Sequence, residues 1–473
     1  MPDAPPRRRP RLSLRAALLL VLVVGLPLGW KARRASIQRR AVVAVRAVGG
    51  KVSYLDELDA RGFPRRPHRP GGPAWLRRWV GDEFFQEVGY VNFDTRAPGG
   101  RVDDDSIGVL GAFEHLQGLT IWGQGTNDET PARVRLTAAG LGRLIGLRRL
   151  RILHLLGVPV DAAMVAVLPG LPALEDVEFR DPARSSGALP GACLADLARI
   201  PGLRKVTIIP LTPCRAADVA PLGRLEHLDE LWLSPSPRDD AGLGPLVARP
   251  SLRVLRLPQT EFTPATLAAV GRNANLQGLT FDGSKLTQGD LKHLAGLAGL
   301  VELDVMLDGR SGRPNAHHLV DRVAGRFGDA DLDALAAAPL KGLTLMGLDA
   351  TDAGVGRLLQ GHSFVNLTLR GRGITDASIA PLVGQVGLSS LTLADTGITD
   401  AGLGRLKALG GLKALSLVDN AGLTDAGVAG LAAFPKLDYL TIRQPGVRPA
   451  TLDAIRAARV RFNIFQALDE VAR

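Results

Sequence analysis

The feature that most constrains this chain is a stretch that repeats itself every 24 residues, from about Val365 to Arg443. Successive units in it begin at Phe364, Leu388 and Leu412. A fixed period of this length is typical of proteins built from stacked repeats. One unit cannot bury its own apolar face, whereas stacked neighbours can bury each other's. The sequence therefore predicts an elongated array of similar units.

Each unit predicts a strand followed by a short helix. In the unit that starts at Leu388, Leu391 and Leu393 alternate with polar residues, which is typical of a strand with one buried face. Leucines then recur every three residues, as on one face of a helix. Thr399 or Asp400 can cap that helix by accepting a hydrogen bond from a free backbone N–H. The same cap recurs at Asp239-Asp240, Thr351-Asp352, Thr375-Asp376 and Thr424-Asp425.

The pattern extends over most of the chain as fifteen units. Most first apolar positions lie 23 to 25 residues apart, and they are Val88, Leu116, Leu150, Leu174, Leu203, Leu228, Leu252, Leu276, Leu300, Leu340, Phe364, Leu388, Leu412, Leu437 and Val460. Three longer gaps mark insertions at 123–133, 181–191 and 308–328. These are rich in glycine, proline or charge, so they are predicted loops, used for recognition or simply tolerated on the surface.

The Leu-x-x-Leu-x-Leu pattern resembles the leucine-rich repeat family, and the resemblance covers most of the chain. It implies an α/β fold: a right-handed solenoid, or horseshoe, with a parallel sheet on the concave side and short helices on the convex side. The family typically has Asn, Thr, Ser or Cys eight residues after the first leucine. This chain has suitable residues there in six units, namely Ser236, Thr260, Ser284, Asp308, Thr396 and Asn420.

The N-terminal part differs from the repeats in charge and hydropathy. The net charge is +11, but residues 1–80 hold 18 Lys and Arg against 4 Asp and Glu, so the remainder is slightly negative. Because the excess flanks an apolar run, Ala16–Trp30, it predicts membrane attachment and no nucleic-acid binding. We expect a basic tail at 1–11, a transmembrane or signal-anchor helix at 12–30, and the repeat body outside the cytoplasm. A cleaved signal peptide and a helix lying on the membrane surface are the alternatives.

The segment between this anchor and the repeats is predicted in two parts. Residues 31–73 read as a juxtamembrane helix followed by a linker rich in Pro and Arg, where prolines forbid a regular helix. Residues 74–87 contain Trp75 and Trp79 at helical spacing, and we expect them to cover the exposed edge of the first repeat. The repeat domain with its C-terminal cap then occupies 88–473.

No motif indicates catalysis, a metal or a cofactor. Cys193 and Cys214 lie in neighbouring units, and two small buried residues is the preferred interpretation over a disulfide. His317 and His318 are adjacent on an inserted loop beside Asp321, whereas a metal requires three or four converging ligands. The chain has no phosphate-binding loop and no nucleophile elbow. We therefore expect a protein that is not an enzyme and binds no cofactor.

The best candidate surface is the predicted concave face. The residue between the second and third strand apolars of each unit points there, and in the C-terminal half this residue is mostly Thr. In the middle units aromatic and charged residues take its place. Trp and Arg are the residues that most often anchor protein interfaces. The candidate binding residues on this side are Trp122, His154, Glu178, Arg180, Glu230, Trp232 and Arg256.

The sequence thus favours a non-enzymatic interaction module. It resembles bacterial leucine-rich repeat proteins that carry an N-terminal membrane segment, which implies a protein partner bound on the concave face. Two alternatives stay open: a structural cell-envelope protein without a specific ligand, and an enzyme with its site in the 308–328 insertion.

Overall fold

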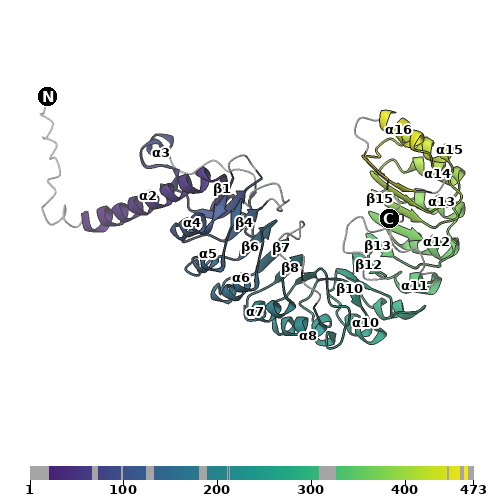
Figure 1. Ribbon diagram of the computed structural model, residues 1–473, viewed down its shortest axis with the longest axis horizontal. Helices are drawn as coiled ribbons and strands as arrows, with labels where there is room; N and C mark the ends of the chain where they lie inside the picture. The colour runs from purple at the N-terminus through teal and green to yellow at the C-terminus, as the bar shows by residue number, and fades with distance from the viewer. Residues whose placement is uncertain are drawn as a thin grey trace, which may run out of the picture. The chain divides into compact units, whose positions relative to one another are not determined.

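The computed structural model describes residues 21–65, 73–96, 100–123, 133–180, 189–209, 211, 214–307, 326–444, 447–458 and 463–466. The chain divides into two compact units, Met1–Asp176 and Val177–Arg473. In each of them short helices lie on one side of a layer of strands (Figure 1). We call the other side of the strand layer the open face.

Unit 1 begins with one long helix and then alternates strands with short helices. Its helices are α2 (Leu26–Ala47), α3 (Ala74–Val80), α4 (Asp104–Gly108), α5 (Ala138–Gly142) and α6 (Ala162–Val167). Its strands are β1 (Gly50–Tyr54), β2 (Val88–Asp94), β3 (Val102–Asp103), β4 (Gly118–Trp122), β5 (Val134–Arg135) and β6 (Ile152–Leu156). Strand β2 pairs antiparallel with β1 and parallel with β4, which pairs parallel with β6. The pair β3–β5 forms a separate parallel ladder.

Unit 2 repeats the same strand-and-helix alternation with parallel strands. The strands lie side by side in chain order. They are β7 (Asp176–Arg180, whose first residue ends unit 1), β8 (Lys205–Ile209), β9 (Glu230–Leu233), β10 (Val254–Glu261), β11 (Gly278–Asp282), β12 (Glu302–Met306), β13 (Gly342–Leu345), β14 (Asn366–Arg370), β15 (Ser390–Ala394), β16 (Ala414–Val418), β17 (Tyr439–Arg443) and β18 (Asn463–Gln466).

The helices of unit 2 are all short, from about one turn to nearly three turns. They are α7 (Leu194–Leu197), α8 (Ala216–Val219), α9 (Gly244–Val247), α10 (Pro264–Val270), α11 (Asp329–Ala334), α12 (Asp352–Gly361), α13 (Ile379–Val383), α14 (Asp400–Arg405), α15 (Asp425–Ala429) and α16 (Pro449–Ala458). Leucines from strands and helices meet between the two layers and are almost fully buried, for example Leu391, Leu403 and Leu406.

The 24-residue period appears directly in the strand register. Leu367 pairs with Leu391 and Leu391 with Leu415, so equivalent leucines stack in a column. The eighth-position residues also contact one another: Thr396 Oγ1 donates to Asn420 Oδ1 at 2.6 Å, and Asn420 Nδ2 donates to Leu393 O at 2.9 Å. These bonds satisfy buried main-chain and side-chain groups where the chain leaves the strand. The predicted stacking is confirmed.

On the helix side, each Thr-Asp pair links two repeats. Thr399 is the helix cap and accepts from Ala401 N–H. The carboxylate of Asp376, from the preceding repeat, accepts from Thr399 N–H at 2.8 Å and from Thr399 Oγ1 at 2.6 Å. Asp400 does the same for Thr424. Equivalent pairs are Asp104–Thr137, Asp240–Thr263, Asp329–Thr351 and Asp352–Thr375.

The residue two positions after the Asp of each Thr-Asp pair is small, because it faces the Asp carboxylate of the preceding repeat. Gly402, two residues after Asp400, is an example. A Cβ added to Gly402 would lie 2.0 Å from Asp376 Oδ1. Where the position is Ser378, its hydroxyl instead donates to Asp352 Oδ1 at 2.5 Å. Burial alone would raise the pKa of Asp352, but hydrogen bonds from Ser378 and Thr375 outweigh it and lower that pKa.

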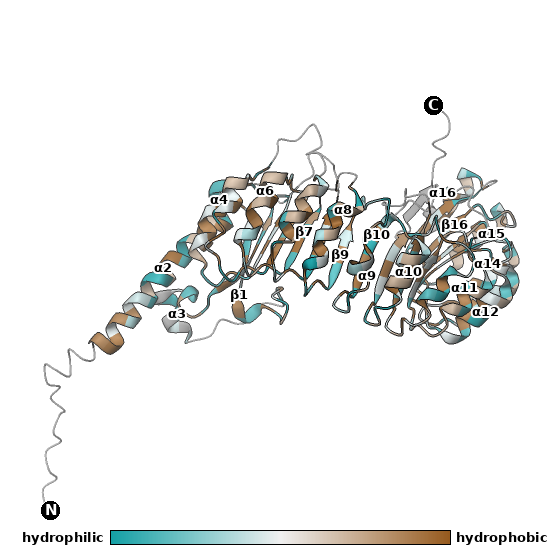
Figure 2. Ribbon diagram, turned by 90° about the horizontal axis from the view of Figure 1, so that it is seen from below, coloured by the Kyte–Doolittle hydropathy of each residue, from teal (hydrophilic) through white to brown (hydrophobic). Residues whose placement is uncertain are grey.

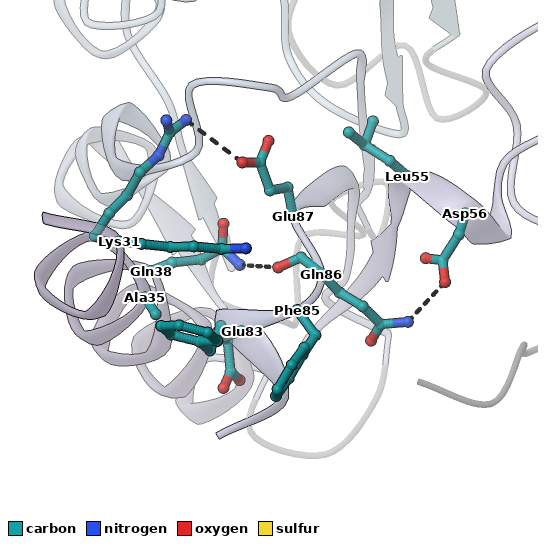
Figure 3. A pocket seen from close by; sticks show the side chains of 11 residues that line it. Lys31, Ala35, Gln38, Leu55, Asp56, Glu83, Phe85, Gln86 and Glu87 are labelled. Atoms are coloured by element: carbon teal, nitrogen blue, oxygen red, sulfur yellow. Dashed lines mark hydrogen bonds and ion pairs between the residues drawn. The ribbon is translucent and has the colours of Figure 1, made fainter. Parts of the chain in front are cut away.

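The first strand of the repeats is covered by residues 35–54. Five residues of α2, Ala35, Gln38, Ala41, Val42 and Val45, are buried. Gln38 Nε2 donates to Gln86 O at 2.8 Å (Figure 3), and β1 pairs along β2. The sequence interpretation placed this cap at 74–87, with Trp75 and Trp79 inside it. Both tryptophans are exposed, because the edge of β2 is already occupied by β1 from the predicted linker.

The predicted anchor at 12–30 is described only from residue 21. A π-helical turn, η1 (Val21–Gly25), leads into α2, whose first residues are apolar and exposed (Figure 2). Among the described residues, no helix combines the length and the apolar character needed to span a bilayer. Residues 1–20 lie outside the described part of the chain.

We predict that Gly402→Ala destabilises the array, whereas Gly404→Ala in the same helix does not. The new methyl group at 402 displaces the Asp376 carboxylate from Thr399, and leaving those groups unpaired costs about 1–3 kcal/mol. No atom lies within 4 Å of a Cβ at 404, and Ala there favours the helix by about 0.5–1 kcal/mol. Urea unfolding midpoints measure both. Equal midpoints for the two variants would show that the contact between Asp376 and Thr399 contributes nothing measurable to the free energy of unfolding.

Candidate functional site

The strand positions that we expected to face the partner form a continuous row on the open face of unit 2. Thr207, Trp232, Arg256, Thr280 and Asp304 are paired across four consecutive parallel strand contacts. Within β9, Leu231 and Leu233 are buried, whereas Glu230 and Trp232 are partly exposed. Side chains alternate between the two faces of a strand, so the row faces away from the helices. The predicted column is confirmed for this unit.

The centre of the row is an indole held between two guanidinium groups. Arg180 Cζ lies 4.8 Å from the Trp232 ring centroid, and Arg256 Cζ lies 5.4 Å from it. A guanidinium within about 6 Å of an indole is attracted by the negative face of the ring. Three rigid or nearly planar groups from β7, β9 and β10 therefore share one surface. We call Arg180, Trp232 and Arg256 the arginine–tryptophan cluster.

Carboxylates fix both arginines. Arg180 Nε lies 2.6 Å from Glu178 Oε1, and Arg256 Nη2 donates to Glu302 Oε2 at 2.9 Å. Lys205 Nζ lies 4.0 Å from Glu178 Oε2 and 3.8 Å from Glu230 Oε2. Exposed ion pairs add little to stability, but they hold long side chains in one arrangement. The cluster is thus preorganised and carries both signs of charge.

Asp304 follows Thr280 in this row and is half-buried. Burial raises the pKa of Asp304 above its ordinary value, against hydrogen bonds from Thr344 and Thr280 that lower it. The Glu302 carboxylate raises the same pKa further, and Arg256 lowers it. The Thr280 hydroxyl lies 3.3 Å from the Asp304 carboxylate. A negative charge here is therefore costly at neutral pH.

Two of the predicted site residues lie in unit 1 and have other surroundings. His154 is 7% exposed; its ring packs against Phe63 at 5.7 Å, and its Nε2 lies 3.1 Å from Asp176 Oδ1. Segment 55–65, predicted as part of the linker, supplies that cover. Trp122 is partly exposed beneath Arg96, whose Cζ lies 4.5 Å from the ring centroid. We therefore build the candidate site from Glu178, Arg180, Glu230, Trp232 and Arg256 alone.

Sequence reasoning missed Lys205 and Glu302, which complete the charge pairs. Both stand two residues before a row residue and share its face by strand alternation. Glu230 stands in the same relation to Trp232, so this alternation was a usable signal for the other two residues.

Other sequence predictions concern chemistry. Cys193 and Cys214 are buried and form no disulfide with each other, and burial raises the pKa of Cys214 to about 11. In the described ranges no three His, Cys, Asp or Glu side chains converge as metal ligands do. His317, His318, Asp321 and most of each insertion lie outside the described residues.

The repeat geometry defines the fold. Parallel strands stack at a 24-residue period, leucines form the inner column, and Asn or Thr side chains bridge the bends after the strands. The described repeats therefore fold as an α/β solenoid with the repeat geometry that the leucine-rich-repeat resemblance implied. Its leucine-rich repeats were predicted from the Leu-x-x-Leu-x-Leu pattern.

Comparison with known proteins adds fold neighbours. No protein-family model matches the sequence, and no curated protein matches it either. An internalin from Listeria monocytogenes is 20% identical over 72% of this chain and 78% of that chain, with a TM-score of 0.40. A leucine-rich-repeat protein from Leptospira interrogans is 14% identical over 76% and 91%, also at 0.40. A plant peptide hormone receptor is 14% identical over 80% and 62%, at 0.42. Because these scores are below 0.5, the description of the fold rests on the repeats themselves.

We predict that Asp304→Asn stabilises the protein at neutral pH. Because the folded-state pKa lies above the unfolded value, the folded protein loses stability as pH rises through those two pKa values. Asn keeps the shape and removes the charge. Thermal unfolding should show a higher midpoint for the variant at about pH 7 and a smaller difference near pH 3.5. A lower midpoint at neutral pH would mean that Arg256 and the two threonines outweigh burial.

Proposed function

We propose that the protein is a non-enzymatic module that binds a protein partner through the arginine–tryptophan cluster on the open face of unit 2. The observation that carries the proposal is the partly exposed Trp232 ring held between Arg180 and Arg256. Trp and Arg are the residues that most often anchor protein interfaces. The side chains of the cluster already hold one conformation before a partner binds, so binding does not have to immobilise them.

The charges around the cluster indicate the kind of partner. Arg180, Lys205 and Arg256 are matched by Glu178, Glu230 and Glu302 at contact distances. A surface with both signs in a fixed order favours a partner with a complementary order of charges. A protein or an extended peptide of mixed charge fits this description better than a polyanion does.

We predict that a photo-reactive amino acid at Glu230 or Glu302 forms discrete covalent adducts with a partner in living cells. The same group at Arg405, which is exposed on the helix side, serves as the matched control. Trp232→Ala should reduce the adduct by an amount equivalent to about 2 kcal/mol, or roughly thirtyfold in affinity. The fold should survive, as checked by circular dichroism. Absence of specific adducts, or adducts unaffected by Trp232→Ala, would favour a structural envelope protein without a ligand.

We infer further that the N-terminal segment attaches the protein to a membrane. In sequence the apolar run Ala16–Trp30 lies between clusters of Arg and Lys. Apolar side chains at its end are exposed in the structure: Leu22, Val23, Val24, Leu26, Leu28 and Trp30. A contiguous exposed apolar surface requires a partner or a lipid phase. The cations on both sides of the run can contact lipid headgroups. As a separate part of this proposal, the repeat body lies on the side of the membrane away from the cytoplasm.

We predict that the full chain stays in the membrane pellet after alkaline carbonate washing, and that deletion of residues 1–30 releases it. Because α2 buries its contacts with the repeats only from Ala35 onward, the shortened chain should keep its fold. Protease added to intact and to permeabilised cells then reports on which side the repeat body lies. Release of the full chain by carbonate would exclude a spanning anchor.

A further inference from the structure

Helix α3 carries the most exposed aromatic pair among the described residues. Trp75 is 68% exposed and Trp79 is 87% exposed. Residues four apart lie on the same side of a helix, so the two indoles form one surface. A pair of large aromatic side chains exposed to water is unusual on a protein surface. Such an apolar patch indicates contact with another protein, a membrane or a ligand. The neighbouring residues in α3 are Arg77 and Arg78.

The end of α3 is held against α2. Gly81, with a φ of 89°, turns the chain from α3 into the 3₁₀ turn η3 (Asp82–Phe84) beside the Arg39 side chain. Arg77 Nη1 donates to Asp82 Oδ1 at 3.4 Å, which ties α3 to that turn. Lys31 Nζ then lies 5.0 Å from the centre of the Phe84 ring. This surface belongs to a defined part of unit 1.

Between η3 and α2 lies a hollow of about 340 Å³, lined among others by Lys31, Arg34, Phe84 and Phe85 (Figure 3). Arg34 closes part of it by pairing with Glu114 at 2.8 Å. The hollow lies beside the first turns of α2, close to Trp30. The α3 region is therefore near the end of α2 that carries the exposed apolar residues.

The distance along α2 is short. From Trp30 to Arg39 the helix rises by about 13 Å, at about 1.5 Å per residue. The headgroup layer of a bilayer is about 5–8 Å thick on each side, and membrane helices are commonly inclined by about 20°. An inclination of α2 toward α3 therefore moves Trp75 and Trp79 toward the headgroup layer.

We propose that α3 makes a second, lateral contact with the membrane interface, with Trp75 and Trp79 inserted among the headgroups and Arg78 beside anionic lipid. The proposal rests on the membrane attachment proposed above for the N-terminal segment. The occupant is a bilayer because Trp and cations together are the residues enriched at membrane interfaces. Exposed Lys31, Arg33, Arg39 and Arg40 on α2 supply further positive charge. The contact would fix the inclination of unit 1 to the membrane.

The test uses tryptophan quenching by brominated lipid in the full-length chain, reconstituted into vesicles of phosphatidylcholine and phosphatidylglycerol. Three variants replace the other tryptophans by Phe: one keeps Trp30, one keeps Trp75 and Trp79, and one keeps Trp122. Trp30 reports on attachment, the pair reports on α3, and Trp122 on the sheet of unit 1 is the control. We expect the pair to be quenched about twofold more than Trp122.

The outcomes separate the two proposals. Quenching of Trp30 and of the pair supports the lateral contact. Quenching of Trp30 with a pair no more quenched than Trp122 overturns it and leaves attachment intact. An unquenched Trp30 overturns attachment and the lateral contact together. If acrylamide fails to reach the pair in detergent-solubilised chain and brominated lipid does not quench it, a second copy or another protein covers α3, which also overturns the proposal.

Discussion

Six of the described repeats depend on a carboxylate from the repeat before them. The start of every short helix leaves backbone N–H groups without partners inside the helix. The Thr cap satisfies one or two of them, and Asp376 or its equivalent binds the N–H and hydroxyl of the Thr itself. The strand side of a repeat is already fixed by parallel pairing. The carboxylate fixes the helix side, so both edges of a repeat are tied at the same period.

This double attachment explains why function is sought on the open face. Leucines are committed to the core, and the Thr-Asp pairs are committed to the bridges. The row residues on the open face belong neither to the core nor to these bridges. In the C-terminal repeats they are mainly threonines, such as Thr368 and Thr392. The aromatic and charged residues at Trp232 and Arg256 therefore stand out on a scaffold that does not require them. A rigid sheet also holds them at spacings that a partner can match.

The N-terminal segment combines two tasks in one helix. Its second half buries Ala41, Val42 and Val45 and closes the edge of unit 1 together with β1. Its first turns, around Leu26 and Trp30, are exposed and apolar. An edge strand left open would offer unpaired backbone groups to other chains. The helix that helps to cover this edge is thus the same continuous helix whose first turns expose apolar side chains.

The sequence alone determined the repeat period, the strand-and-helix alternation and the row of residues on the open face, because these follow from periodic hydropathy and strict alternation along a strand. Tertiary structure decided what periodicity does not encode. Gly402 is small because another repeat's Asp376 occupies its side. His154 is buried because segment 55–65 folds back over it. The pairs of Lys205 with Glu178 and of Arg256 with Glu302 join residues from different repeats. Such contacts depend on which chain segments meet in space, and no local pattern records that.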